Sequence, residues 1–279
     1  MLPDGAMQPQ PHAGGVRDLV ELDPDHPGFR DRAYRERRNA IAQLALDYRA
    51  GAAVPTAPYS DDEHAVWRAV WRELAPLHER FGCATYRDCS RRLAMDVERI
   101  PQLAWINART AATTGFTMLP VAGLVSARRF LDYLADGVFL STQYIRHHSR
   151  PLYTPEPDVV HELVGHAAMF MDPTYARISR AFGAAARGAD DARLTALERI
   201  YWYTLEFGLV REAGQLKACG AGLLSGAGEL ASFTTRAELR PFDLAAMAAR
   251  PYDPTGFQPV LFVAESFAEI EGLAERLPR

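Results

Sequence analysis

A glutamate inside an aromatic and apolar segment constrains the fold of this chain most strongly. Glu206 lies in the run Ile-Tyr-Trp-Tyr-Thr-Leu-Glu-Phe-Gly-Leu-Val at positions 200–210. Burial of an ionised carboxylate costs on the order of several kcal/mol unless a positive partner compensates for it. The neighbouring Arg199 or Arg211 could form a salt bridge with it, and a bound metal ion could compensate for the charge equally well. The fold must therefore bring a positive group to Glu206.

The candidates for a shared metal site are two histidines, His161 and His166, in the run Pro-Asp-Val-Val-His-Glu-Leu-Val-Gly-His at 157–166. On a regular α-helix, five positions turn a side chain by about 140°, whereas the i, i+4 histidines of zinc proteases share one face. Both histidines could reach one ion only if the helix is distorted near Gly165, for example by a single π-turn. The sequence therefore predicts a π-bulge here if these histidines and Glu206 bind one metal.

Several kinds of site are compatible with this spacing. A zinc hydrolase would use Glu162 as general base toward a metal-bound water. A 2-oxoglutarate oxygenase usually has a His-x-Asp/Glu pair before a distant histidine, the reverse of the order here. A non-haem Fe(II) site with two histidines and one carboxylate leaves half of the octahedron open, which suits oxygen chemistry in an aromatic pocket. The spacing alone leaves these alternatives, and a site without metal, open.

Length and charge exclude other classes. The chain has 279 residues, of which 48% are hydrophobic, and a formal net charge of -4. This predicts one sizeable core and gives no basic excess for nucleic acid. No run of 18 apolar residues and no apolar N-terminal region occurs, so we expect no membrane span or secretory signal. Three cysteines without a Cys-x-x-Cys pair predict reduced thiols in a cytoplasmic enzyme.

The pattern of apolar residues predicts a mainly α fold with a small β element near the C-terminal third. Residues 1–18 are rich in proline and glycine and are expected to form a flexible N-terminal arm. Helices are expected near 41–50, from the Ser60 and Glu63 capping box to a kink or end at Pro76, at 126–136, from His161, from Asp172 with Tyr175 on its core face, and from 192 to about 214. The other expected segments are a glycine-bearing loop at 115–125, a strand at 138–144 and an extended stretch at 147–158.

Several separate motifs resemble one known family. They are Tyr-Ile-Arg-His at 144–147, Tyr-Thr-Pro-Glu-Pro with the histidine run at 153–166, Tyr-Trp-Tyr-Thr-Leu-Glu-Phe-Gly-Leu at 201–209, Gly-Ala-Gly-Leu-Leu-Ser at 220–225, and the flanking runs 25–29 and 259–267. Over about residues 22–270 the chain is similar to the pterin-dependent aromatic amino acid hydroxylases, closest to bacterial phenylalanine hydroxylase. The resemblance implies that residues 19–279 form one catalytic iron- and pterin-dependent monooxygenase domain.

The resemblance also implies a metal and a cofactor. His161, His166 and Glu206 match the Fe(II) ligands of the family. A reduced tetrahydropterin would supply electrons, and O2 would be the co-substrate. The positions that match pterin contacts are Gly123, Val125, Phe130, Glu162 and Tyr201.

The implied substrate is a free aromatic L-amino acid, phenylalanine, which would be hydroxylated to tyrosine. Arg146 matches the arginine that binds the substrate carboxylate, a task suited to a bidentate guanidinium. Asp158 would orient this arginine. The other positions that match the substrate site are Thr154, Trp202, Phe207, Cys219, Gly222 and Ser225.

Some positions depart from the family pattern. Cys219 stands where members usually have tyrosine, Gly226 and Ala227 replace a serine and a phenylalanine, and Leu140 replaces a histidine of animal members. Because a shift of about 1 Å in the placement of the substrate ring can redirect an oxidation, meta-hydroxylation of phenylalanine, or tyrosine or tryptophan as substrate, is an alternative outcome.

The chain has room for neither the regulatory domain nor the tetramer helix of animal members, which predicts a monomer or weak dimer.

Overall fold

The structure is a computed structural model that describes residues 18–277. The predicted arm at 1–18 lies outside the described residues except for Asp18. This residue is buried, and its carboxylate accepts hydrogen bonds from the Arg35 guanidinium at 2.9 and 3.0 Å. The chain is therefore packed from the first described residue.

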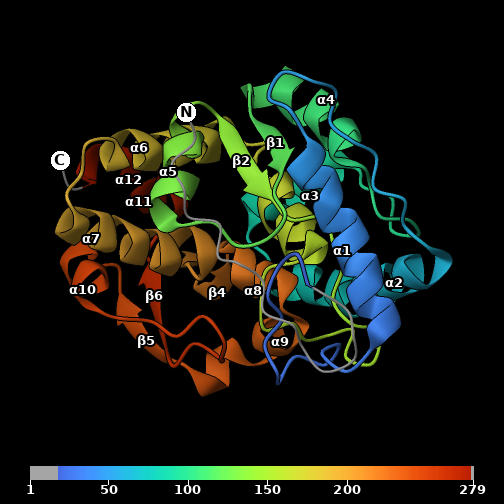
Figure 1. Ribbon diagram of the computed structural model, residues 1–279. Helices are drawn as coiled ribbons and strands as arrows, with labels where there is room; N and C mark the ends of the chain where they lie inside the picture. Colours follow the sequence, from blue (N-terminus) through green and yellow to red (C-terminus); the bar gives the residue numbers. More distant parts are fainter. Residues whose placement is uncertain (1–17, 278–279) are drawn as a thin grey trace.

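The described residues form mostly helices, with short strands between them (Figure 1). The α-helices are α1 (Arg32–Asp47), α2 (Asp61–Phe81), α3 (Ala84–Leu93), α4 (Leu103–Thr114), α5 (Ala127–Ala135), α6 (Pro173–Ala186), α7 (Asp191–Tyr201), α8 (Ala221–Ser225), α9 (Ala227–Arg236), α10 (Leu244–Ala249), α11 (Phe267–Glu271) and α12 (Leu273–Arg276). Two further segments are π-helices, η1 (His161–Ala167) and η2 (Trp202–Glu206). Figure 1 shows α1 to α4 on one side of the molecule and α6, α7 and α10 on the other. The predicted mainly α fold is confirmed.

The strands form two small sheets. They are β1 (Thr117–Pro120), β2 (Val138–Ser141), β3 (Leu209–Glu212), β4 (Gln215–Ala218), β5 (Glu238–Pro241) and β6 (Val260–Ala264). Strands β1 and β2 pair in parallel, and the second sheet has the order β4-β3-β6-β5. Strand β6 is buried along its whole length and pairs in parallel with β3 and β5, so it is the centre of the C-terminal sheet. The small β element was correctly predicted.

Local sequence signals account for several helix starts. The predicted capping box is present, because Ser60 Oγ accepts from the Glu63 amide and the Glu63 carboxylate accepts from the Ser60 amide. Ser126 and Asp172 cap α5 and α6 in the same way through one side-chain oxygen each. Each cap satisfies a backbone N–H that would otherwise lack a partner in the first turn. Helix α1 begins at Arg32, earlier than expected.

Three predicted boundaries were wrong. Helix α2 does not end at Pro76 but continues to Phe81, because buried Leu74 and His78 on either side pack its inner face and offset a proline cost of about 3 kcal/mol; the alternative of a kink at Pro76 stays a prediction. The expected loop at 115–125 contains β1, which is stabilised by pairing with β2. The helix predicted from 192 to 214 ends at Glu206, because β3 pairs with the distant β6. In both of the last two cases a strand was missed because it is stabilised by pairing with a segment distant in the sequence.

The core brings α8 unusually close to η1. A Cβ atom on Gly165 would lie 2.8 Å from both the Cβ and the carbonyl oxygen of Ala221. Only glycine permits this approach, which places the short helix that carries Gly222 and Ser225 directly against the histidine segment.

The three cysteines are buried free thiols, as predicted. Among residues 18–277, no helix is both long and apolar enough to cross a membrane.

Candidate metal centre

The side chains of His161, His166 and Glu206 converge on one point. The Nε2 atoms of the two histidines lie 3.1 Å apart, and they lie 3.4 and 3.0 Å from the Glu206 carboxylate oxygens, respectively. Donor atoms bound to one transition-metal ion at about 2.0 to 2.2 Å are separated by similar distances. The structure therefore brings together all three predicted ligands, and their atoms fit one ion.

The π-helix η1 explains how histidines five positions apart share a face. Its hydrogen bonds join residues i and i+5, so the side chains of His161 and His166 follow one another along the same side. The predicted distortion near Gly165 is confirmed, and it extends over seven residues. Glu206 ends the second π-helix, η2, which continues directly from α7. Two separate departures from α-helical geometry, η1 and η2, thus build the site.

The charges of the three groups suit a cation. Burial lowers the pKa of His161 to about 4, although Glu206 acts in the opposite direction. Burial also opposes ionisation of Glu206, but His166 and His161 outweigh it and hold the pKa of this carboxyl below its ordinary value. At neutral pH the site thus contains a neutral His161 and a carboxylate. Arg199 binds carbonyl oxygens of 248 and 249 and Arg211 pairs with Glu265, so the salt-bridge alternative for Glu206 is wrong.

Each histidine is held through its other ring nitrogen. Ser225 Oγ lies 3.0 Å from His161 Nδ1 and donates its own proton to the carbonyl of Ala221. Tyr175 Oη lies 3.3 Å from His166 Nδ1. Burial raises the pKa of this phenol well above its ordinary value, so it keeps its proton. Sequence reasoning assigned Tyr175 only to the core face of its helix, because periodicity reports burial and not the partner of a hydroxyl.

Arg146 and Asp158 form a buried pair beside the triad. Arg146 donates from its backbone N and from two guanidinium nitrogens to the Asp158 carboxylate, with all three distances at 2.8 Å. Burial opposes the charge of Asp158, but Arg146 outweighs it and lowers the pKa of the carboxyl. The same carboxylate accepts from the His161 amide at 3.2 Å, which ties the arginine to the start of η1.

Three residues predicted for the substrate site contact one another. The rings of Trp202 and Phe207 lie 4.6 Å apart, and a Cβ atom on Gly222 would lie 2.5 Å from the Phe207 ring. Trp202 also stacks on Tyr252 at 4.0 Å and donates from Nε1 to Gln258 at 2.9 Å. Neither Tyr252 nor Gln258 was predicted, because both belong to the distant, irregular segment before β6.

The residues predicted for the pterin site are only partly brought together. Phe130 contacts Tyr201 edge-on at 5.5 Å, and it contacts Phe139, whose ring lies 4.5 Å from that of His166. Glu162 accepts from the amide and the hydroxyl of Thr142 at 3.1 and 3.0 Å, and burial raises its pKa to about 8.

Four predicted site residues lie apart from these contacts. Gly123 and Val125 lie between β1 and α5, where a Cβ atom on Gly123 would meet Val20. Thr154 donates to the Glu156 carbonyl, and the amide of buried Cys219 donates to Gly208. None of these three contacts involves a residue of the triad.

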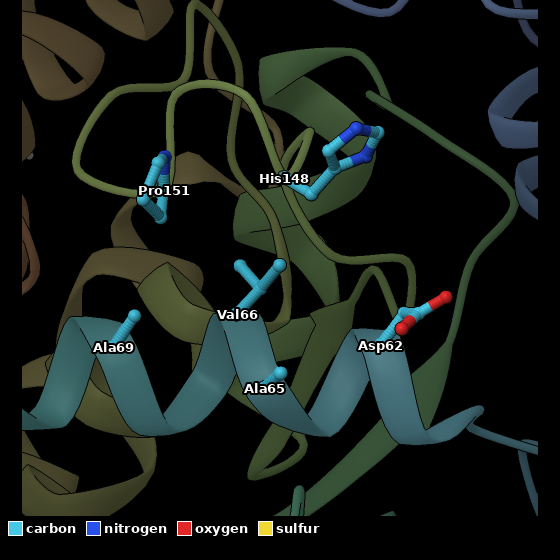
Figure 2. Close-up of a pocket in the computed structure, with 6 residues that line it drawn as sticks. All are labelled: Asp62, Ala65, Val66, Ala69, His148 and Pro151. Carbon is cyan, nitrogen blue, oxygen red and sulfur yellow. The ribbon is translucent and has the colours of Figure 1, made fainter.

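A second group of possible ligands consists of Asp31, His147 and His148. Both ring nitrogens of His147 have partners, since Nε2 lies 3.1 Å from Asp31 and Nδ1 lies 2.8 Å from Ser149 Oγ. Asp31 also caps α1. These contacts indicate a structural cluster. An open cavity of about 370 Å³ lies between α2 and the 148–151 segment, and none of the triad residues lines it. Figure 2 shows His148 among the residues that line this cavity.

Comparison with known proteins identifies the family. The profile of the biopterin-dependent aromatic amino acid hydroxylases matches residues 16–276. The chain is 44% identical to tyrosine 3-monooxygenase of Drosophila melanogaster and 45% identical to phenylalanine-4-hydroxylase of Caenorhabditis elegans, over 89% of its length in both cases. It spans about half the length of these relatives, 44% and 56% respectively.

A solved structure of Chromobacterium violaceum phenylalanine hydroxylase, with bound iron(III) and 7,8-dihydrobiopterin, has the same fold. It matches with a TM-score of 0.77 and 28% identity, over 85% of this chain and 89% of that one. The family profile covers nearly the whole chain, and His161, His166 and Glu206 converge as the resemblance to the family implied. The chain therefore belongs to the biopterin-dependent aromatic amino acid hydroxylases.

Proposed function

We propose that this protein is an Fe(II)- and tetrahydropterin-dependent monooxygenase that hydroxylates the ring of free phenylalanine to give tyrosine. The observation that carries the proposal is the convergence of His161, His166 and Glu206 within 3.0 to 3.4 Å beside an aromatic cluster. A zinc hydrolase with Glu162 as base has no support from the family to which the chain belongs.

The metal would be held by His161 Nε2, His166 Nε2 and the Glu206 carboxylate. Iron(II) and the reduced pterin, when bound, would supply the electrons and the oxygen activation that ring hydroxylation needs. A site with three protein ligands leaves positions for oxygen and water. The protein's own contribution is to orient the donor atoms and to surround the reacting ring with apolar walls.

Arg146 would bind the carboxylate of the amino acid. Its guanidinium is buried, and Asp158 fixes one edge of it with two hydrogen bonds of 2.8 Å. A guanidinium held along one edge presents its other edge in a defined direction, which suits bidentate recognition of a carboxylate. Trp202 and Phe207 would enclose the aromatic ring, and Thr154, Cys219, Gly222 and Ser225 would complete the substrate site.

The pterin would bind near Phe130, Glu162 and Tyr201, with backbone contacts from Gly123 and Val125. Phe130 is held edge-on between Phe139 and Tyr201, so the position of its ring is fixed. Thr142 binds one oxygen of Glu162, Oε1, through two hydrogen bonds. This arrangement supports an acidic contact from the second oxygen to the pterin.

Aerobic incubation with Fe(II), tetrahydropterin and each of phenylalanine, tyrosine and tryptophan tests the proposal, with product positions assigned by NMR. We expect p-tyrosine from phenylalanine, with pterin oxidation that depends on the amino acid and is absent from a Glu206→Gln variant. Oxygen uptake that does not depend on any amino acid would contradict the proposal. A product of m-tyrosine would keep the chemistry but change the outcome, and would trace to the small residues at 219, 226 and 227. Sedimentation would test the predicted monomer or weak dimer.

A further inference from the structure

We propose that Tyr175 is a positioning residue for the metal centre, acting through a hydrogen bond between its hydroxyl and Nδ1 of His166. The inference rests on the proposed function only in that His166 must bind the metal through Nε2. It adds a residue outside the predicted ligand, pterin and substrate sets.

The geometry of His166 makes a second partner necessary. Its Nε2 points to the triad, 3.0 Å from Glu206 and 3.1 Å from His161 Nε2, while Nδ1 lies 3.3 Å from Tyr175 Oη. An imidazole that binds a metal through Nε2 carries its proton on Nδ1, and this N–H needs an acceptor. His166 is 1% exposed, so solvent cannot readily supply one. Within residues 18–277, the acceptor that the structure provides is the Tyr175 hydroxyl.

Tyr175 is held rigidly enough to act in this way. Its amide donates to the capping carboxylate of Asp172 at 2.7 Å, which fixes its place in the first turn of α6. Its ring packs edge-on against Phe170 at 5.4 Å, and Phe170 stacks on Phe116 at 4.2 Å. The phenol therefore cannot move away from His166 without disturbing a packed aromatic cluster.

The His166 ring is thus fixed from two directions. Phe139 packs against the ring at 4.5 Å, and Tyr175 holds Nδ1. Ser225 plays the corresponding part for Nδ1 of His161, whose side chain is more exposed. Because packing alone does not select the tautomer, removal of the Tyr175 hydroxyl should change metal affinity more than it changes the fold.

The test is a Tyr175→Phe variant, measured anaerobically for Fe(II) and Co(II) binding by competition with a chelator. We expect the dissociation constant to rise about 10- to 100-fold, the range found when outer partners of metal-bound histidines are removed. The absorption spectrum of the Co(II) form should also change, because the ligand ring can turn. Neither readout depends on catalytic turnover.

A Tyr86→Phe variant is the matched control. Tyr86 Oη lies 3.4 Å from the ring nitrogens of His78, so this variant also removes a buried hydroxyl from a histidine, but from one outside the triad. Its metal affinity should equal that of the wild type, and thermal unfolding of both metal-free variants should reveal any difference in fold. Wild-type affinity and an unchanged Co(II) spectrum in Tyr175→Phe would overturn the inference and leave the proposed function intact. A wild-type protein that binds neither metal would instead refute the proposed metal site.

Discussion

The guanidinium of Arg146 and the carboxylate of Asp158 form a buried pair with two side-chain hydrogen bonds of 2.8 Å. The pair lies between strand β2 and the π-helix that carries both histidines, and Asp158 also accepts from the His161 amide. One carboxylate thus links the proposed substrate-binding arginine to the proposed metal centre. A change in Asp158 should therefore affect folding and substrate affinity together.

We predict that Asp158→Asn destabilises the protein by about 3 to 5 kcal/mol at pH 7, because it leaves a buried arginine without its counter-charge. Its KM for phenylalanine should also rise. The pKa of Asp158 is lowered on folding, so its stabilising contribution is full above the unfolded pKa of about 3.9 and is lost as the pH falls through the folded value. In urea unfolding between pH 3 and 7, the free energy of unfolding of the variant should fall less with decreasing pH than that of the wild type. Asp136→Asn, which removes an exposed partner of Arg187, is the control and should behave like the wild type.

Glu206→Gln should abolish tight metal binding with little change in shape. The variant removes the only carboxylate among the three proposed ligands. Its loss of metal affinity should therefore exceed the loss of about 100-fold that is the upper range when a hydrogen-bond partner of a metal ligand is removed. Titration with Co(II), followed by absorption, measures this directly. Glu265→Gln, which removes an exposed carboxylate paired with Arg211, serves as control. Metal affinity in Glu206→Gln equal to that of the control would disprove the ligand assignment.

The orientation of Trp202 offers a prediction about substrate affinity. Gln258 Oε1 accepts from the indole at 2.9 Å, and its side-chain nitrogen Nε2 donates to the carbonyl oxygens of Asp253 and Gly256 at 2.7 and 3.0 Å, so the Gln258 side chain fixes the indole to the segment before β6. Gln258→Leu should raise KM for phenylalanine by about tenfold, the effect of about 1.4 kcal/mol, with a smaller change in metal affinity. Tyr252→Phe keeps the stacked ring and loses the bond to Glu198, so it should have a smaller effect. Steady-state kinetics of both variants measures the two KM values for phenylalanine. Equal values would contradict the role of Gln258 in orienting Trp202.

The family resemblance implied the ligand set, and that set in turn predicted the π-turn, because histidines five positions apart can share an ion only if the helix is locally underwound. The contacts of Tyr175, Gln258 and Thr142 were not predictable in this way. Each joins segments far apart or reports the direction of one hydroxyl or amide, whereas periodicity reports only which face is buried. The same limit explains the wrong end of the helix predicted to reach 214, since the pairing of β3 with β6 outweighs local helical preference.

The close approach of α8 to η1 gives a prediction about a single methyl group. In Gly165→Ala the new Cβ atom would lie 2.8 Å from the Cβ and carbonyl oxygen of Ala221, so one of the two segments must move. We expect a loss of about 1 to 3 kcal/mol from overpacking, together with weaker metal binding, because Ser225 on α8 holds His161. Gly228→Ala in α9 is the matched control: its nearest neighbour would be the Phe257 ring at 3.5 Å, an ordinary contact, so the better helix propensity of alanine should stabilise it slightly. Opposite signs of the two stability changes in urea unfolding support the packing argument, whereas equal stability of both variants would mean that α8 can retreat from η1 freely.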